Sequence, residues 1–175
     1  MNKNLKNALI AALLVVIQVF LLNNIQLRGM LDAFVAPCIY LMYLLLMPMG
    51  TPHVRIQFVA FALGFSVDFL SGTLGINTAA CVLLAFLRPS MLKLLNREER
   101  NKGTRPSVHL FGWKSFFWYA FTLTFVFHLA LCLLEVFTLS DFHLTLLRAL
   151  LSAAASTVLI LMIELIFDKK EKRYR

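Results

Sequence analysis

The feature that most constrains this chain is a series of apolar runs, each long enough to cross a lipid bilayer as a helix. The hydrocarbon core of a bilayer is about 30 Å thick, which corresponds to about 20 helical residues. Such runs occupy about 8–27, 31–49, 56–72, 75–94, 114–138 and 144–167. The runs are continuous rather than alternating, so the sequence predicts helices and not the strands of a membrane barrel.

The composition agrees with this interpretation. Of the 175 residues, 60% are hydrophobic and 15% are charged, and the mean hydropathy is +0.78. Soluble domains are about 45–50% apolar and about 25% charged, and a chain this short cannot bury such an excess in a water-soluble core. We therefore expect an all-α integral membrane protein, a bundle of six transmembrane helices in one domain (1–175), and not a soluble enzyme or a disordered chain.

The net charge of +8 predicts the orientation of the bundle. If the N-terminus is cytoplasmic, all 17 basic residues except Arg28 and Arg148 lie on the cytoplasmic side, as the positive-inside rule requires. We expect both termini in the cytoplasm, a solvated basic loop over about 96–112 and a basic tail over 168–175. The charge favours contact with anionic lipid, and no nucleic-acid-binding motif accompanies it.

Charged side chains inside the spans are costly in lipid and indicate function or pairing. The candidates are Asp32, Asp68, Glu135, Arg148 and Glu164. We expect Arg148 to pair with Asp68 or Glu135 near the outer face, so that the third, fifth and sixth spans are held together. In the alternative, each side chain extends separately to the interface.

Near the inner face, Arg88 and Glu164 form a second candidate pair. In the alternative, Arg88 binds lipid phosphate and Glu164 binds the lysines of the tail. Pro89 follows Arg88 and weakens the local hydrogen bonding of the helix. His128 lies seven residues before Glu135 on one helix face, which is typical either of a hydrogen-bonded bundle residue or of a proton relay.

No catalytic, metal-binding or cofactor-binding motif is present in the sequence. The three cysteines lie inside apolar runs without the spacing of metal ligands, so we expect buried thiols. The residues between Ser71 and Gly75 form a tight glycine turn, which predicts that the third and fourth spans form a helical hairpin. The sequence therefore predicts a protein that is not an enzyme and that needs no cofactor or metal.

Two stretches resemble one family. Ala36-Pro37-Cys38-Ile39-Tyr40-Leu41 is followed by Leu46-Met47-Pro48, and a hairpin runs from Ala62 through Asp68 and the glycine turn to Arg88-Pro89. Both resemble MreD, the rod-shape-determining membrane proteins of bacteria. The specific motifs lie within residues 36–89, and residues 96–175 agree in hydropathy alone. The structural or contact candidates are Pro37, Gly64, Asp68, Gly72, Gly75, Asn77, Arg88, Pro89, Glu135, Arg148 and Glu164.

The resemblance implies a non-enzymatic scaffold of the cell-elongation complex in the bacterial cytoplasmic membrane. Its implied partners are MreC, a protein with a single transmembrane helix, and, within the same complex, MreB and an elongation-type peptidoglycan synthase. The implied fold is similar to that of the small substrate-binding membrane subunits of vitamin transporters.

The alternative function is a small-ligand-binding subunit of a transporter. Such a subunit needs polar groups that converge on a pocket. The interior polar candidates are few: Gln18, Asn77, Thr78, His128, Thr122 and Thr124. We therefore favour the scaffold. Its contact faces would be the side of the third span with Gly64 and Ser71, or the Ser152–Ser156 stripe of the sixth, unless these small residues serve internal packing.

Overall fold

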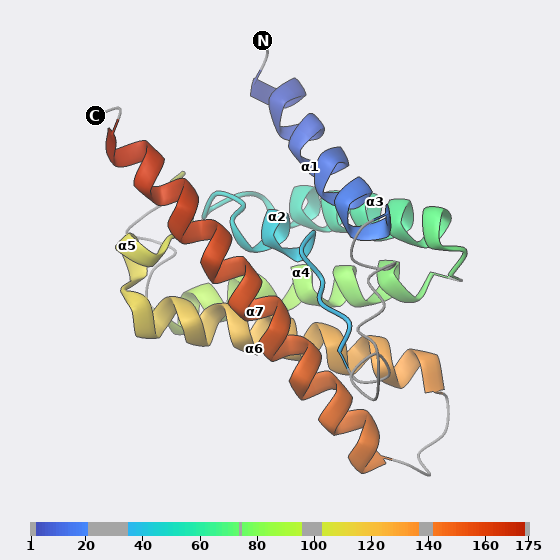
Figure 1. The fold of residues 1–175 in the computed structure, drawn as a ribbon. Helices are drawn as coiled ribbons and strands as arrows, with labels where there is room; N and C mark the ends of the chain where they lie inside the picture. Colours follow the sequence, from blue (N-terminus) through green and yellow to red (C-terminus); the bar gives the residue numbers. More distant parts are fainter. Residues whose placement is uncertain (1–2, 21–34, 74, 96–102, 137–141, 174–175) are drawn as a thin grey trace.

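All regular elements in the part of the chain that the structure describes are α-helices. The computed structural model describes residues 3–20, 35–73, 75–95, 103–136 and 142–173 (Figure 1). The helices are α1 (Lys3–Phe20), α2 (Leu41–Leu45), α3 (His53–Ser71), α4 (Ile76–Leu94), α5 (Val108–Phe111), α6 (Trp113–Val136) and α7 (Phe142–Arg173). The expectation of an all-α fold is confirmed.

Three of these helices are long and apolar enough to cross a membrane, over His53–Ser71, Trp113–Glu135 and His143–Ile166. Large apolar side chains also point outward from the bundle: Phe58 is 74% exposed, Phe69 78% and Trp118 61%. An extensive apolar outer surface suits a lipid environment and not water. These features support a membrane protein, while the number of six spans and their orientation stay predictions.

The helices pack in a chain of neighbours. The hairpin of α3 and α4 is the most extensive contact, α4 packs on α6, α6 packs on α7, and α1 packs on α3. Figure 1 shows α7 crossing the others obliquely, with an extended stretch of chain just before α2 lying between α7 and the hairpin. The core contains the α2 region as well as the long helices, since Tyr40, Leu44 and Met49 are almost wholly buried.

The second predicted span differs most from expectation. Its described part does not form a continuous helix over 31–49. Residues 35–38 are extended, the chain turns at 39–40, and only the five residues of α2 are helical before an irregular stretch leads to α3. Pro37 lacks an N–H and disfavours helical geometry in the residue before it, so the proline works against a helix here. Residues 31–34, including Asp32, lie outside the described residues.

Two further expectations need correction. Helix α7 continues to Arg173, beyond the expected end of the span at 167 and into the expected tail. The described half of the 96–112 loop is not simply solvated, because Val108 and Phe111 of α5 are buried. Loop residues Gly103 and Thr104 also exchange backbone hydrogen bonds of 2.8 and 2.9 Å with Met49. Apolar side chains in this loop provide the reason for its packing.

The aromatic residues around the start of α6 divide between two environments. In the sequence, six aromatic residues stand together at the start of the fifth predicted span, which predicts an interfacial belt: Phe111, Trp113, Phe116, Phe117, Trp118 and Tyr119. In the structure, Phe111, Phe116 and Tyr119 belong to the core, whereas Trp113 and Trp118 are more than half exposed. Only the two tryptophans therefore occupy positions suited to a membrane interface.

Candidate functional site

Asp68, near the end of α3, caps the start of α4. Its carboxylate is buried and accepts five hydrogen bonds, from the Thr73 hydroxyl, from the backbone and side-chain amides of Asn77, and from the backbone amide and hydroxyl of Thr78. The backbone bonds are 3.1 and 2.8 Å long. Gly75, which precedes α4, has no side chain for capping. Because the first N–H groups of a helix lack partners and attract negative charge, a carboxylate here is stabilising.

Gly64 lies one turn before Asp68 on the same face of α3. A Cβ atom at this position would lie 2.5 Å from the Cα of Thr78 and 2.9 Å from the carbonyl oxygen of Asn77. The two helix backbones therefore touch, and only glycine fits between them. We call Gly64, Asp68, Thr73, Asn77 and Thr78 the hairpin lock. The Gly64 face serves internal packing and does not face outward.

The two glycines of the turn occupy different positions, one at the end of α3 and one before α4. Gly72 ends α3 with a φ of 69°, and Gly75 precedes α4 with a φ of 79°. Both angles are in the left-handed region that favours glycine. The amides of Gly72 and Thr73 both bond to the carbonyl oxygen of Asp68. The helical hairpin predicted from the sequence is confirmed.

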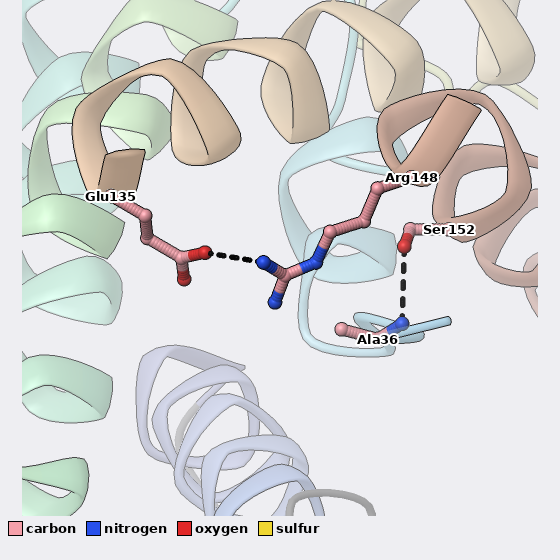
Figure 2. A network of polar contacts seen from close by, with 4 residues as sticks. All are labelled: Ala36, Glu135, Arg148 and Ser152. Carbon is pink, nitrogen blue, oxygen red and sulfur yellow. Dashed lines mark hydrogen bonds and ion pairs between the residues drawn. The ribbon is translucent and has the colours of Figure 1, made fainter. Parts of the chain in front are cut away.

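Two serines of α7 hold the extended stretch that precedes α2. The Ala36 amide donates to the Ser152 hydroxyl at 3.0 Å (Figure 2). The Cys38 amide donates to the Ser156 hydroxyl at 2.9 Å. The serines are four residues apart and both are buried. The stretch is not helical, so its backbone amides have no partners within a helix. The serine hydroxyls accept their hydrogen bonds instead. Ser152, Ala153 and Ser156 of the small-residue stripe therefore serve internal contacts, whereas Ala154 is exposed.

Gln18 of α1 bonds to the same stretch from another side. Its amide nitrogen donates to the carbonyl oxygen of Pro37 at 3.0 Å, and its side-chain oxygen accepts from the amide of Ile39 at 2.8 Å. A single buried glutamine therefore satisfies both a donor and an acceptor of the irregular backbone. We call residues 35–39, together with Gln18, His128, Ser152 and Ser156, the segment clamp.

His128 of α6 completes the clamp. Its Nδ1 lies 2.8 Å from the carbonyl oxygen of Thr124, and its Nε2 lies 3.0 Å from that of Ala36 and 3.3 Å from the Ser156 hydroxyl. The side chain is 2% exposed. The expectation that His128 is a hydrogen-bonded bundle residue is confirmed. Glu135, the other member of the proton-relay alternative, pairs with Arg148 instead.

Tyr40 connects the segment clamp to the hairpin lock. Its hydroxyl is buried and donates to the Asn77 side-chain oxygen at 3.1 Å. The Cys81 sulfur lies 3.8 Å from the same hydroxyl. Tyr40 directly follows the extended stretch, and Asn77 also donates to Asp68. Hydrogen bonds therefore connect the end of the stretch to the glycine turn.

Arg88 of α4 holds the chain where it leaves α2. Its Nε donates to the Tyr119 hydroxyl at 3.0 Å, and its Nη2 donates to the carbonyl oxygens of Leu45 and Met47. The Tyr119 hydroxyl donates to the Leu45 carbonyl at 2.9 Å. Arg88 is 1% exposed, so its guanidinium does not meet lipid phosphate. Carbonyl oxygens near a helix C-terminus attract a cation.

Arg88 and Glu164 do not form an ion pair among the described residues. Glu164 is buried on α7 and has interactions of its own. The side chains of the tail lysines, its partners in the alternative, lie outside the described residues. Pro89 is buried within α4, and the helix continues past it to Leu94. For Arg88 itself neither expectation holds, because its buried guanidinium donates to the Tyr119 hydroxyl and to backbone carbonyls of the irregular stretch.

Arg148 pairs with Glu135, one of the two carboxylates that the sequence offers as its partner near the outer face. Its Nη1 lies 3.2 Å from Glu135 Oε2 (Figure 2). The two side chains are 36% and 35% exposed. The pair joins α6 to α7 but does not reach α3, because Asp68 serves the hairpin lock. Arg148 lies one turn before Ser152, so the ion pair sits beside the segment clamp.

Sequence reasoning overlooked most of the clamp. The sequence predicts Gln18 only as an interior polar residue and Ser152 and Ser156 only as small packing residues. It predicts hydrogen bonding of His128 within the bundle, but not its partners. The usable signal was an uncharged polar side chain inside an apolar run, since such a group must find a partner in lipid. The identity of the partner, an irregular backbone, was not visible from that signal.

The comparisons with known proteins give no relative: no family model, curated protein or solved structure matches this chain. Among the described residues, no three His, Cys, Asp or Glu side chains are placed to share a metal ion. The geometry therefore defines an α-helical, membrane-type protein whose polar groups surround an irregular stretch of its own chain.

Proposed function

We propose that this protein is a non-enzymatic scaffold of the bacterial cell-elongation complex, with six spans in the cytoplasmic membrane and both termini in the cytoplasm. The proposal rests on the resemblance of residues 36–89 to MreD. One structural observation supports it: the buried polar side chains of the segment clamp bond to the protein's own backbone.

A ligand-binding subunit would use such side chains differently. Its polar groups converge on an open cavity, where they exchange hydrogen bonds with the ligand. Here Ser152, Ser156 and Gln18 bond to amides and carbonyls of residues 36–39 at 2.8–3.0 Å. A protein organised in this way contacts partners through its outer helix faces and its ends.

The implied partners follow from the resemblance. MreC, with its single transmembrane helix, is the direct partner in this proposal, and MreB and an elongation-type peptidoglycan synthase belong to the same complex. The role of the protein is to help couple the MreB filaments to lateral peptidoglycan synthesis and so to regulate cell shape.

The test is site-specific photo-crosslinking in cells with the full-length protein. A photoreactive residue is placed at outward positions on three helices, Phe69 of α3, Trp118 of α6 and Met162 of α7, all more than half exposed. Phe127, which is 0% exposed, is the matched buried control. We expect one outward face to crosslink to a protein with a single transmembrane helix, while Phe127 gives no such product.

Two results would contradict the scaffold. One is recovery of an ATPase pair and a transporter coupling subunit from mild detergent, identified by mass spectrometry. The other is normal cell shape after depletion of the protein in a strain without a second copy of its gene.

One observation favours the alternative of a transporter subunit. Irregular backbone within a membrane protein is tolerated where it is buried in protein or lines a cavity, and it is common at transporter binding sites. Residues 35–39 have this character. In the alternative, a small ligand would compete with the segment clamp, and purified protein would release that ligand on denaturation.

A further inference from the structure

Two exposed lysines lie at the same level at one end of the bundle. Arg88 of α4 and Tyr119 of α6 are joined by a hydrogen bond of 3.0 Å. Lys93 lies five residues after Arg88, and Lys114 lies five residues before Tyr119. Because α4 and α6 run in opposite directions (Figure 1), both lysines lie about 7.5 Å beyond this bond, towards the same end. Both side chains are exposed.

The loop before α6 brings a third exposed cation to this end. Its backbone pairs with Met49 through two hydrogen bonds, which hold the chain just before Arg105. The Arg105 side chain is exposed. Among the acids whose side chains the structure describes, only Glu135 is exposed, and it lies at the other end of α6. The exposed charge described at this end is therefore positive.

The length of α6 places Lys114 at the level of lipid headgroups. Lys114 and Glu135 are 21 residues apart, which corresponds to about 31 Å of helix, and a hydrocarbon core is about 30 Å thick. The only two tryptophans of the chain, Trp113 and Trp118, lie beside Lys114 and are 52% and 61% exposed. Tryptophan is enriched at the membrane interface, so both signals give the same depth.

One face of α6 continues from this lysine into the apolar part of the span. Lys114 and Trp118 are four residues apart and share that face. The Trp118 ring contacts Phe121 with centroids 6.4 Å apart, and Phe121 stacks on Phe125 at 6.2 Å. The two phenylalanines are half-buried. A cation at headgroup level is thus followed directly by a row of aromatic rings, which suits a headgroup and its acyl chain better than an acidic protein segment.

We propose that the face of α6 formed by Lys114, Trp118, Phe121 and Phe125 binds an anionic phospholipid. The phosphate lies at the Lys114 ammonium group, and one acyl chain lies along the rings. The net charge of the chain favours anionic lipid anywhere on its basic surface, whereas these contacts select one helix face. The site does not rest on the proposed scaffold function, and it leaves the outward faces of α3 and α7 to a partner helix.

The two tryptophans provide a local reporter for the experiment. In the full-length Trp113→Phe variant, Trp118 is the only tryptophan. The protein is reconstituted in phosphatidylcholine vesicles with a rising fraction of phosphatidylglycerol whose chains carry bromine, which quenches indole fluorescence on contact. Brominated phosphatidylcholine with the same chains is the reference lipid. We expect an about fivefold preference for phosphatidylglycerol at Trp118, the advantage that one lysine gives near an anionic headgroup.

Four substitutions in this background separate the α6 face from the charge of the whole chain. Lys114→Gln is expected to remove the fivefold preference, and Lys114→Arg is expected to retain it. Arg148→Gln removes one positive charge near the other end of α6 and is the matched control that leaves the preference unchanged. Lys93→Gln, at the same level on α4, is expected to lower the preference less than Lys114→Gln does.

Three outcomes would overturn the proposal. Equal quenching by the two brominated lipids would exclude an anionic lipid and leave the cations to an acidic protein segment. Equal losses in Lys93→Gln and Lys114→Gln would assign the attraction to the whole basic end and not to the α6 face. A preference that persists in about 1 M NaCl, where charges are screened beyond about 3 Å, would exclude attraction by the ammonium group. The unchanged protein, with both tryptophans, is expected to prefer the same lipid.

Discussion

The hairpin lock and the segment clamp are both buried polar networks, but they connect the chain over very different distances. Asp68 reaches Asn77 and Thr78 across nine and ten residues. Cys38 reaches Ser156 across 118 residues, and Ala36 reaches His128 across 92. The hairpin can therefore form from neighbouring residues alone, whereas the clamp needs α1, α6 and α7 to be in place. Local contacts form at a smaller entropic cost than distant ones.

The chemistry of the two networks differs as well. One carboxylate accepts five hydrogen bonds in the hairpin lock. The clamp uses neutral groups, mostly in one-to-one bonds to backbone. Hydrogen bonds to charged groups contribute about 1.5–3 kcal/mol each and neutral ones about 0.5–1.5 kcal/mol. We therefore expect substitutions in the lock to be more destabilising than those in the clamp.

The largest effect is expected at Gly64. Gly64→Ala would place a Cβ 2.5 Å from the backbone of Thr78, and backbone cannot move aside without separating the helices. The gain in helix propensity of about 1 kcal/mol is outweighed, and we expect a net loss of about 3 kcal/mol. Unfolding in detergent micelles measures this loss. Ala62→Val on the exposed face of α3 is the control, and equal stability of the two variants would contradict the close approach.

Asp68→Asn tests the charge of the hairpin lock. The amide keeps the shape but replaces one accepting oxygen with a donor that faces the donors of Thr78, so we expect a loss of about 2–3 kcal/mol. Thr78→Val removes one of the five bonds to the carboxylate and should cost about 1.5 kcal/mol. The same unfolding assay ranks the two variants. If Asp68→Asn were the milder of the two, the carboxylate would not be the centre of the lock.

Tyr119→Phe probes the far end of the irregular stretch. The hydroxyl that is lost accepts from Arg88 and donates to the Leu45 carbonyl, and the expected loss of stability is about 1.5–2 kcal/mol. Tyr43→Phe, at a half-buried tyrosine of α2, provides the control and should change stability by less than about 0.5 kcal/mol. Equal melting temperatures for both variants would remove Tyr119 from the network that holds the chain after α2.

The same contrast explains what could be predicted from the sequence. The hairpin, its glycine turn and its buried aspartate are encoded within about twenty neighbouring residues, and glycine and aspartate are distinctive in an apolar run. The pairing of Arg148 was also predictable, because few opposite charges lie at that depth. The extended stretch was not, because its hydropathy equals that of a helix and its partners are uncharged side chains on three other helices.

Arg88 shows where an argument from charge alone fails. A cation in an apolar run suggests an anion, and Glu164 or a lipid phosphate was the natural candidate. The guanidinium instead binds the carbonyl oxygens of Leu45 and Met47, at and just after the end of α2. A regular helix at 31–49 would have bonded the Leu45 carbonyl internally, but not the Met47 carbonyl in its last turn. The wrong partner predicted for Arg88 is therefore linked to the wrong helix predicted at 31–49. Both predictions depend on where the backbone groups of this segment make their hydrogen bonds.

Ser156→Ala tests the segment clamp itself. The Cys38 amide would lose its acceptor in a buried position, at an expected cost of about 1–1.5 kcal/mol. Alkylation of Cys38, which is 6% exposed, should become several times faster as the stretch loosens, and mass spectrometry locates the label. Cys81, at 0% exposed, should react no faster than before. The exposed Ser90→Ala is the matched control. Faster labelling of both thiols would indicate general unfolding and not release of the stretch.

The smallest effect is expected for the Glu135–Arg148 pair, which belongs to neither network. Each partner is about a third exposed, and pairs of this kind contribute about 0–1 kcal/mol. A double-mutant cycle with Glu135→Gln and Arg148→Gln isolates the interaction between the two side chains, and we expect a coupling energy below about 1 kcal/mol. A coupling above about 2 kcal/mol would mean that the pair is shielded from water in the membrane. In that case the ion pair would be a third strong polar connection beside the two networks, because α6 and α7 would then be joined as firmly as α3 and α4 are at Asp68.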